Sequence, residues 1–203
     1  MRIGEPSLYL GCALEARSAT VFQVFLDYGW DINKPLERAM VPALGYISYD
    51  RALTEWFLDH GADPNAPCAW DITAMSEAMY RAPLSTIEML FSRGGDIKRG
   101  QLLHNAVFRD GPDVIELAGL LLDMGASINE IQYENHSQAF GERCAFGLGT
   151  PLHYAAGEGK VELVSYLLQR GADPSIRNTK GRTVIEAAEF WQQSEVVRIL
   201  KSG

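Results

Sequence analysis

The sequence predicts an all-α solenoid, in which similar helix pairs stack one upon the next. Three observations favour this fold. A short glycine-led segment recurs along the 203 residues, a second signature precedes it by about twenty residues, and an apolar stripe with helical spacing lies between the two. A period of roughly 20–50 residues is the sequence signature of repeat architectures.

The glycine-led segments recur at a nearly constant spacing. They are Gly29-Trp30-Asp31-Ile32-Asn33, Gly61-Ala62-Asp63-Pro64-Asn65, Gly94-Gly95-Asp96-Ile97, Gly125-Ala126-Ser127-Ile128-Asn129 and Gly171-Ala172-Asp173-Pro174-Ser175. Their first glycines are 32, 33, 31 and 46 residues apart. We expect each first glycine to end a helix in the left-handed conformation, which glycine adopts without the penalty of a Cβ atom.

The second signature marks the start of a helix. It is clearest in Thr150-Pro151-Leu152-His153-Tyr154-Ala155-Ala156, and it is echoed at 73–79 and 103–107. Thr150 suits a helix N-cap and Pro151 suits the first turn. A second helix follows, with an apolar stripe of Leu163, Val164, Leu167 and Leu168. One helix pair cannot bury this stripe alone, so each pair needs neighbours and the array becomes a stack with an extended concave surface.

These motifs resemble the ankyrin repeat, whose pattern runs T-P-L-H-x-A-A, then G, then V-V-x-x-L-L, then G-A-D-x-N. The resemblance covers nearly the whole chain and implies one ankyrin-repeat domain over residues 1–203, with hairpin fingers between the helix pairs. Six units are expected, at 5–34, 38–66, 71–98, 100–130, 148–176 and 181–203, with an insertion at 131–147. The phrases at 98–104 and 146–153 are similar to those of short ankyrin-only proteins of filamentous fungi.

Two insertions interrupt the period, and insertions in solenoids map to loops that leave the stacking undisturbed. The larger lies between Ile131 and Gly149 and is expected to be a long loop. Such a loop is either functional or a tolerated surface insertion. The smaller falls within 108–113, where Pro112 is expected to open the second helix of its unit.

Candidate binding residues follow from aligning the units. In the ankyrin family, the two residues after the double-alanine position face the concave groove. The resemblance therefore implies a partner-binding site of Tyr49, Asp50, Tyr80, Arg81, Phe108, Arg109 and Glu158, with Trp70 on a neighbouring finger. Aromatic residues and arginine are enriched at binding hot spots. Alternatively, the aromatics cover joints between units and the carboxylates neutralise the arginines. Phe190 and Trp191 are expected to cover the exposed end of the stack.

An enzyme is the less favoured interpretation. His104 and His153 share one motif position, where the resemblance implies hydrogen bonding between adjacent repeats rather than catalysis or metal binding. No metal-binding, phosphate-loop or nucleophile motif is present, so we expect no catalytic residue, metal or cofactor. The alternative is an enzyme or small-molecule-binding protein with a pocket between the groove and the 131–149 insertion. A third possibility is a structural unit that oligomerises.

Charge and composition restrict the partners. A formal net charge of −8 and a pI near 5.0 oppose binding to nucleic acid or an anionic membrane surface. Three widely spaced cysteines do not suit a disulfide framework and fit a reducing compartment. We therefore expect a protein of the cytoplasm or nucleus. The resemblance to ankyrin repeats implies that it binds another protein as an adaptor, inhibitor or neutraliser, and we expect it to be a monomer.

Overall fold

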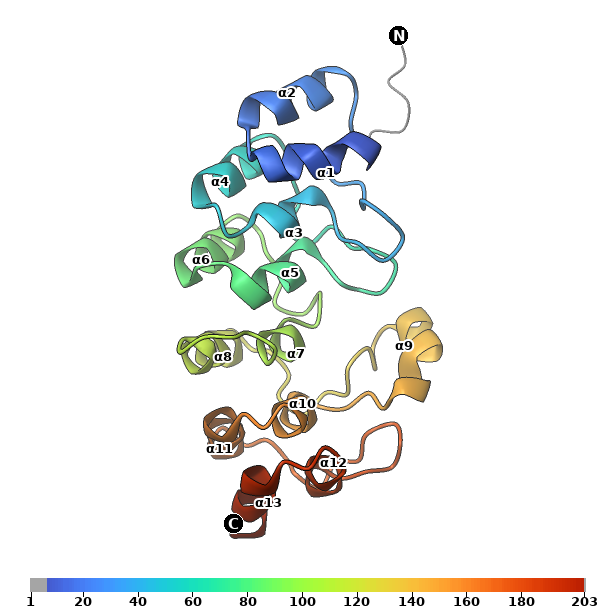
Figure 1. The fold of residues 1–203 in the computed structure, drawn as a ribbon, viewed down its shortest axis with the longest axis vertical. Coiled ribbons are helices and arrows are strands. Elements are labelled where there is room, and N and C mark those ends of the chain that lie inside the picture. The colour runs from blue at the N-terminus through green and yellow to red at the C-terminus, as the bar shows by residue number, and fades with distance from the viewer. Residues whose placement is uncertain (1–6, 203) are drawn as a thin grey trace. The chain divides into compact units, whose positions relative to one another are not determined.

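The computed structural model describes residues 7–202, and within that range the all-α prediction is confirmed. Regular structure there consists of helices, with isolated β-bridges at Glu37–Met40 and Pro67–Thr73 in place of strands. The chain divides between Gly100 and Gln101 into two compact units, called unit 1 and unit 2 here (Figure 1). Each unit contains helix pairs of the predicted kind.

Unit 1 is a stack of helix pairs. Its helices are α1 (Ser7–Ala16), α2 (Ala19–Asp27), α3 (Ala43–Ile47), α4 (Arg51–Asp59), α5 (Ala74–Arg81) and α6 (Leu84–Ser92). The first helices of the pairs, α1, α3 and α5, contact one another in that order. Phe22 of α2 and Phe57 of α4 meet edge to face with ring centroids 4.8 Å apart, and neither side chain is exposed. Each pair therefore covers the apolar face of the next, as the apolar stripes predict.

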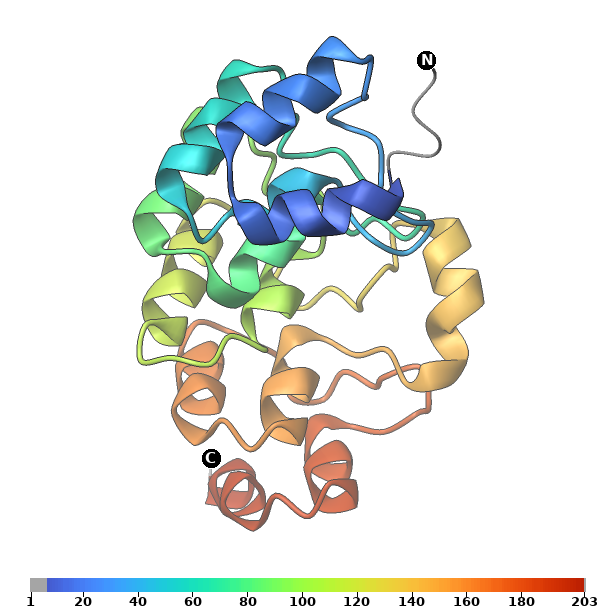
Figure 2. The ribbon, with the colours of Figure 1, turned by 45° about the horizontal axis from the view of Figure 1, so that its top comes forward.

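Unit 2 repeats this arrangement and adds an inserted segment. Its helices are α7 (Leu102–Ala106), α8 (Val114–Asp123), α9 (Ser137–Arg143), the 3₁₀-helix η1 (Cys144–Phe146), α10 (Pro151–Gly157), α11 (Val161–Gln169), α12 (Val184–Phe190) and α13 (Ser194–Ser202). The first helices α7, α10 and α12 contact in series, and so do the second helices α8, α11 and α13. Both ribbon views show α9 set apart from these helix pairs (Figures 1 and 2).

The recurrent glycines end the second helices as predicted. Gly61 and Gly171 follow the ends of α4 and α11 with φ values of 88° and 92°, the left-handed region that suits glycine. The amide N–H of each of these glycines returns to a carbonyl oxygen of the preceding turn, from Leu58 and Leu168 respectively. The glycine-led motif is therefore a helix C-cap, and the chain turns into the finger directly after it.

The asparagines of the same motif link each finger to the next. The Asn33 amide donates to the Gly61 carbonyl oxygen at 2.9 Å, and its side-chain oxygen accepts from the Asp63 N–H at 2.7 Å. Asn65 repeats both bonds with Gly94 and Asp96. Since Lys98 occupies the corresponding position of the third finger, this asparagine ladder ends within unit 1. The motif thus encodes the spacing between neighbouring repeats as well as the turn.

In unit 2 the ladder spans the insertion. Asn129 donates to the Gly171 carbonyl oxygen at 3.4 Å and accepts from the Asp173 N–H at 2.8 Å, although more than 40 residues separate the partners. The corresponding partners in unit 1 are about 30 residues apart. The extra residues therefore leave the repeat spacing intact, as expected for an insertion in a solenoid.

Helix starts follow the sequence closely, with one correction. Helix α10 begins at Pro151, and the Thr150 hydroxyl and N–H meet Nδ1 of His153 at 2.9 and 3.2 Å. The prediction that Pro112 opens the second helix of its unit is wrong. Helix α8 begins two residues later, at Val114, because Pro112 lies in the turn that Asp113 completes.

Candidate functional site

The predicted binding residues fall in both units, and those of unit 1 are only partly available. Tyr49 is 37% exposed, with the Arg17 guanidinium 4.5 Å from its ring centroid. Asp50 has a structural role, because its carboxylate caps α4 by accepting from the Leu53 N–H at 3.0 Å. Trp70 lies half-buried in the finger that precedes α5. The Asp50 carboxylate is thus engaged in capping α4, and the Arg17 guanidinium already covers part of the exposed Tyr49 ring.

Tyr80 and Arg81 end helix α5 close to the half-buried carboxylate of Glu77. Burial raises the pKa of Tyr80 to about 12, and the nearby Glu77 raises it further. Burial also raises the pKa of Glu77, an effect that the charge of Arg81 opposes. Arg81 itself is exposed, whereas Tyr80 is half-buried. In this part of unit 1 the aromatic rings therefore pack into the structure more than they form an open surface.

The predicted residues of unit 2 include one correction. Arg109 is only 6% exposed, and its Nε donates to the Asp113 carboxylate at 2.8 Å while a second nitrogen binds the other oxygen. This bidentate pair holds the pKa of Asp113 below its usual range. Arg109 is therefore a buried structural cation rather than the exposed contact that the alignment predicted. Phe108, half-buried, packs against Tyr154 with ring centroids 5.5 Å apart.

Unit 2 contains a hollow of about 480 Å³. Helices α10 and α12, the finger between α11 and α12, and the end of the inserted segment supply most of its walls. Its lining consists of Phe108, Phe146, Gly147, His153, Tyr154, Gly157, Glu158, Asn178, Lys180, Arg182, Ala187, Phe190 and Trp191. Of the predicted residues, Phe108 and Glu158 belong to it. The hollow lies where the alternative interpretation placed a pocket, between the groove and the 131–149 insertion.

The inserted segment forms a defined wall rather than the long loop that the sequence predicted. Most of it is helical, in α9 and η1, and His136 caps α9 by accepting from the Ala139 N–H at 3.1 Å. The Gln132 N–H donates to the Gly149 carbonyl oxygen at 3.0 Å and closes the base of the segment. Thr179 of the next finger binds its far end through the Leu148 and Cys144 carbonyl oxygens.

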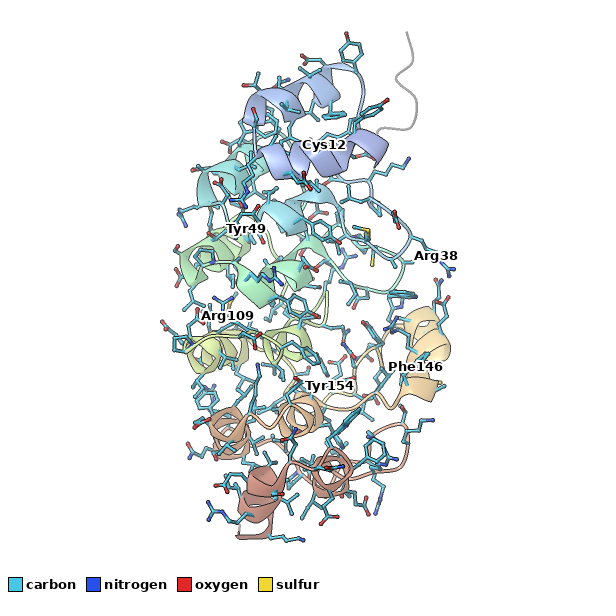
Figure 3. The ribbon with its side chains drawn as sticks, in the orientation of Figure 1. Cys12, Arg38, Tyr49, Arg109, Phe146 and Tyr154 are labelled. Carbon is cyan, nitrogen blue, oxygen red and sulfur yellow. The ribbon has the colours of Figure 1, made fainter. Side chains whose placement is uncertain are left out.

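Tyr154 is the residue that sequence reasoning missed, and it joins the wall to the helices (Figure 3). Its hydroxyl donates to Oε1 of Gln132 at 2.6 Å, and burial raises its pKa. Tyr154 occupies the variable position of the T-P-L-H-x-A-A signature, one helical turn before the residues chosen by alignment. The sequence did hold a signal for Tyr154. Residues three or four apart on a helix share one face, so Tyr154 could have been expected on the same face as Glu158.

Phe190 and Trp191 do not cover the end of the stack as predicted. They line the hollow, remain 54% and 62% exposed, and meet edge to face with centroids 5.1 Å apart. The Arg182 guanidinium lies 3.8 Å from the centre of the Phe190 ring. Phe146, at the end of the inserted segment, is 80% exposed (Figure 3). These three large aromatic side chains therefore face solvent around one hollow instead of being buried in a joint between repeats.

The two motif histidines hold neighbouring repeats together. Nε2 of His153 meets the Arg182 carbonyl oxygen at 3.1 Å, and Nε2 of His104 meets the Glu130 carbonyl oxygen at 3.0 Å. Burial lowers the pKa of His104 to about 4 and lowers that of His153 as well. Both rings are thus neutral hydrogen-bonding groups at neutral pH.

Among the described residues, no group of three or more histidine, cysteine or acidic side chains could hold a metal ion. The same part of the chain has no helix long and apolar enough to cross a membrane.

Comparison with known proteins finds ankyrin repeats, in agreement with the helix pairs described above. Residues 103–203 match the family model described as Ankyrin repeats (3 copies). Protein phosphatase 1 regulatory subunit 12A of Mus musculus is 36% identical over 100 residues, which are 49% of this chain and 10% of that protein. The putative E3 ubiquitin-protein ligase XBAT34 of Arabidopsis thaliana is 34% identical over 90 residues, or 44% of this chain and 21% of the ligase. The NAD-capped RNA hydrolase NUDT12 of Macaca fascicularis is 30% identical over 91 residues, which cover 45% of this chain and 17% of the hydrolase.

Proposed function

Because the chain is an ankyrin-repeat protein, we propose that it binds a partner protein and that unit 2 holds a segment of that partner in its hollow. Ankyrin repeats generally mediate protein–protein interaction, and the family is typically not catalytic. The observation that carries the proposal is the gathering of exposed Phe146, Phe190 and Trp191 around one concave surface. Exposed aromatics in a concave site are the residue type that dominates binding energy at protein interfaces.

The size and rigidity of the hollow support this role. About 480 Å³ suffices for a few side chains of an extended segment. Tyr154 is fixed through its hydroxyl, and Phe190 through Arg182. Because these rings are already held in place, their side chains lose less conformational entropy when a partner binds than mobile side chains would.

Binding of a small molecule is the second candidate, since the hollow occupies the predicted pocket position. The lining provides little for catalysis. Both ring nitrogens of His153 are engaged, one with Thr150 and the other with the Arg182 carbonyl oxygen. A general base must reach the proton it removes, and this imidazole is held by the fold instead. We therefore favour a peptide segment over a substrate.

The relatives support only the interaction role. The matched region makes up between 10% and 21% of the phosphatase subunit, the ligase and the hydrolase. The activities of those whole proteins are therefore not carried over to this chain. We further propose that the protein acts in the cytoplasm or nucleus, because Cys12, Cys68 and Cys144 are free thiols.

Selection from a random dodecapeptide library on the immobilised full chain tests the proposed function. We expect peptides with an aromatic or large aliphatic residue to be enriched, and Trp191→Ala to weaken their binding by tenfold or more in fluorescence anisotropy. Tyr28→Ala is the matched control, since Tyr28 is 67% exposed in unit 1. Absence of enriched peptides, or equal loss in both variants, would reject the hollow as the binding site.

A further inference from the structure

Resting on the proposed function, we infer that the hollow selects a partner segment by charge at both of its ends. The segment has an apolar residue at its centre, an acidic residue on one side of it and a basic residue on the other. The acidic residue lies beside Lys180 and Arg182, and the basic residue lies beside Glu158. The inference stands on the positions of these three charged side chains along the hollow.

Lys180 marks the end of the hollow next to the inserted segment. It lies on the finger before α12, and a Cβ atom built on Gly147 would stand 3.3 Å from its Cγ. The finger is fixed there, because the Lys180 N–H donates to the Asn178 carboxamide oxygen and the Thr179 N–H donates to the Leu148 carbonyl oxygen. The ammonium group of Lys180 has no ion pair among the described residues and is exposed.

Glu158 marks the opposite end. It is the C-cap of α10, and its neighbour Gly157 lies against Trp191, whose Cδ1 would be 3.2 Å from a Cβ built there. The other end of α10 lies beside the Lys180 finger, because His153 binds the Arg182 carbonyl oxygen. From Pro151 to Gly157 the helix rises about 9 Å, at 1.5 Å per residue. The exposed carboxylate of Glu158 is therefore separated from the finger by most of the helix length.

Arg182 extends the positive end towards the centre of the hollow. Its guanidinium lies on the Phe190 ring, 3.8 Å from the centroid, and forms no salt bridge within the described part of the chain. A guanidinium held over a ring keeps its in-plane N–H groups for a carboxylate, which it can bind with two parallel hydrogen bonds. An acidic side chain entering beside Phe190 therefore meets two cations that lack a partner carboxylate.

Nearby carboxylates do not cancel this positive end. Glu186 of α12 pairs with Arg177 at 3.2 Å, and Glu189 pairs with Lys201 at 3.0 Å. Neither these acids nor their cations line the hollow. The lining therefore carries two cations towards the finger and one anion at the far end. Complementary charges of this kind decide which partners bind and in which register more than they raise affinity.

The same library selection tests the charge pattern on three variants of the full chain. Wild type should enrich peptides with Asp or Glu on one side of the apolar residue and Lys or Arg on the other. Lys180→Glu should remove most of the acidic preference, because Arg182 is then the one cation left at that end of the lining. Glu158→Lys should exchange the basic preference for an acidic one. Lys98→Glu is the matched control, because Lys98 is an exposed finger lysine of unit 1 whose N–H also donates to a side chain two residues earlier.

Affinities measured by fluorescence anisotropy on one wild-type peptide complete the test. Lys180→Glu should weaken binding about five- to tenfold, and this loss should shrink at high salt. Enriched peptides without a charge preference, or with one that Lys180→Glu and Glu158→Lys leave unchanged, overturn the inference while leaving the proposed function in place. Failure to enrich any peptide overturns both.

Discussion

The two units are built from similar helix pairs but differ in what their side chains do. Unit 1 keeps a nearly constant repeat, links its fingers through Asn33 and Asn65, and buries an aromatic cluster around Phe57. Unit 2 buries mainly aliphatic residues, interrupts its repeat with the 131–149 segment, and leaves Phe146, Phe190 and Trp191 exposed around a hollow. Phe22, Trp30 and Phe57 of unit 1 therefore pack against one another, whereas Phe146, Phe190 and Trp191 of unit 2 face solvent.

This difference shows where binding surfaces arise in a repeat fold. A regular repeat places each first helix against the next, so that groove residues such as Tyr80 become half-buried. In unit 2 the inserted segment adds a wall at the finger side, and Asn129 keeps the helix pairs in register beneath it. We therefore expect different residues to determine the stability of unit 2 and the binding that we propose for it, so that mutations can alter the two separately.

The largest expected effect is on the aromatic core of unit 1. Phe57→Ala should lower the free energy of unfolding by about 3–5 kcal/mol, because it removes a fully buried ring that contacts Phe22, Trp30 and Trp56. Amide hydrogen exchange should show most of the lost protection in α1–α6 and less in α10–α13. Equal loss in both units would contradict their separate description.

Acid should destabilise unit 2 selectively. Where unit 2 has His104 and His153, the same motif position in unit 1 holds Gly45 and Ser76, which do not titrate. The pKa of His104 is about 4 in the fold, against an ordinary value of 6.5 in the unfolded chain. The unfolded chain therefore binds the proton more readily. The contribution, of up to about 3 kcal/mol, is present above pH 6.5 and is lost as the pH falls towards 4.

Hydrogen exchange at pH 7 and pH 5 measures this acid effect in each unit. His104→Gln, whose side-chain amide can place a donor where Nε2 meets the Glu130 carbonyl oxygen, should flatten the pH dependence of unit 2 while lowering its stability at pH 7. Parallel losses in both units on acidification would indicate that groups other than the histidines are responsible.

A smaller effect is expected from one methyl group in unit 1. A Cβ on Gly45 would lie 2.6 Å from Cγ2 of Val41 and 3.0 Å from Cβ of Glu77, so Gly45→Ala should cost about 1–3 kcal/mol in urea unfolding. Gly141→Ala in α9 is the matched change in unit 2, where nothing lies within 4 Å. It should raise stability by up to about 1 kcal/mol, since alanine favours a helix. A neutral Gly45→Ala would show that α3 and α5 can separate freely.

The smallest effect on stability should come from the exposed wall residue. Phe146→Ala should change the unfolding free energy by less than about 0.5 kcal/mol, because the ring is 80% exposed. Its binding of library-selected peptides should nevertheless weaken several-fold, which separates the two roles in unit 2. A marked fall in the melting temperature would show that Phe146 supports the fold.

The sequence by itself determined the helix pairs, their caps and the turns, because these depend on residues close together in the chain. Thr150 and Pro151 start a helix, and Gly61 and Gly171 end one, through hydrogen bonds within a few residues. The structural role of the motif histidines, implied by resemblance to the family, also agrees with their bonds to the next repeat.

Only the tertiary structure decided which aromatic and charged side chains remain open. The alignment gave Arg109 and Glu158 the same role. In the structure, however, Arg109 is buried and paired with Asp113, whereas Glu158 lines the hollow. It also missed Tyr154, whose hydroxyl donates to Gln132 of the inserted segment. The exposure of a side chain depends on neighbours that are distant in sequence. The folding of the 131–149 segment against α10 and its finger created a surface that no single repeat contains.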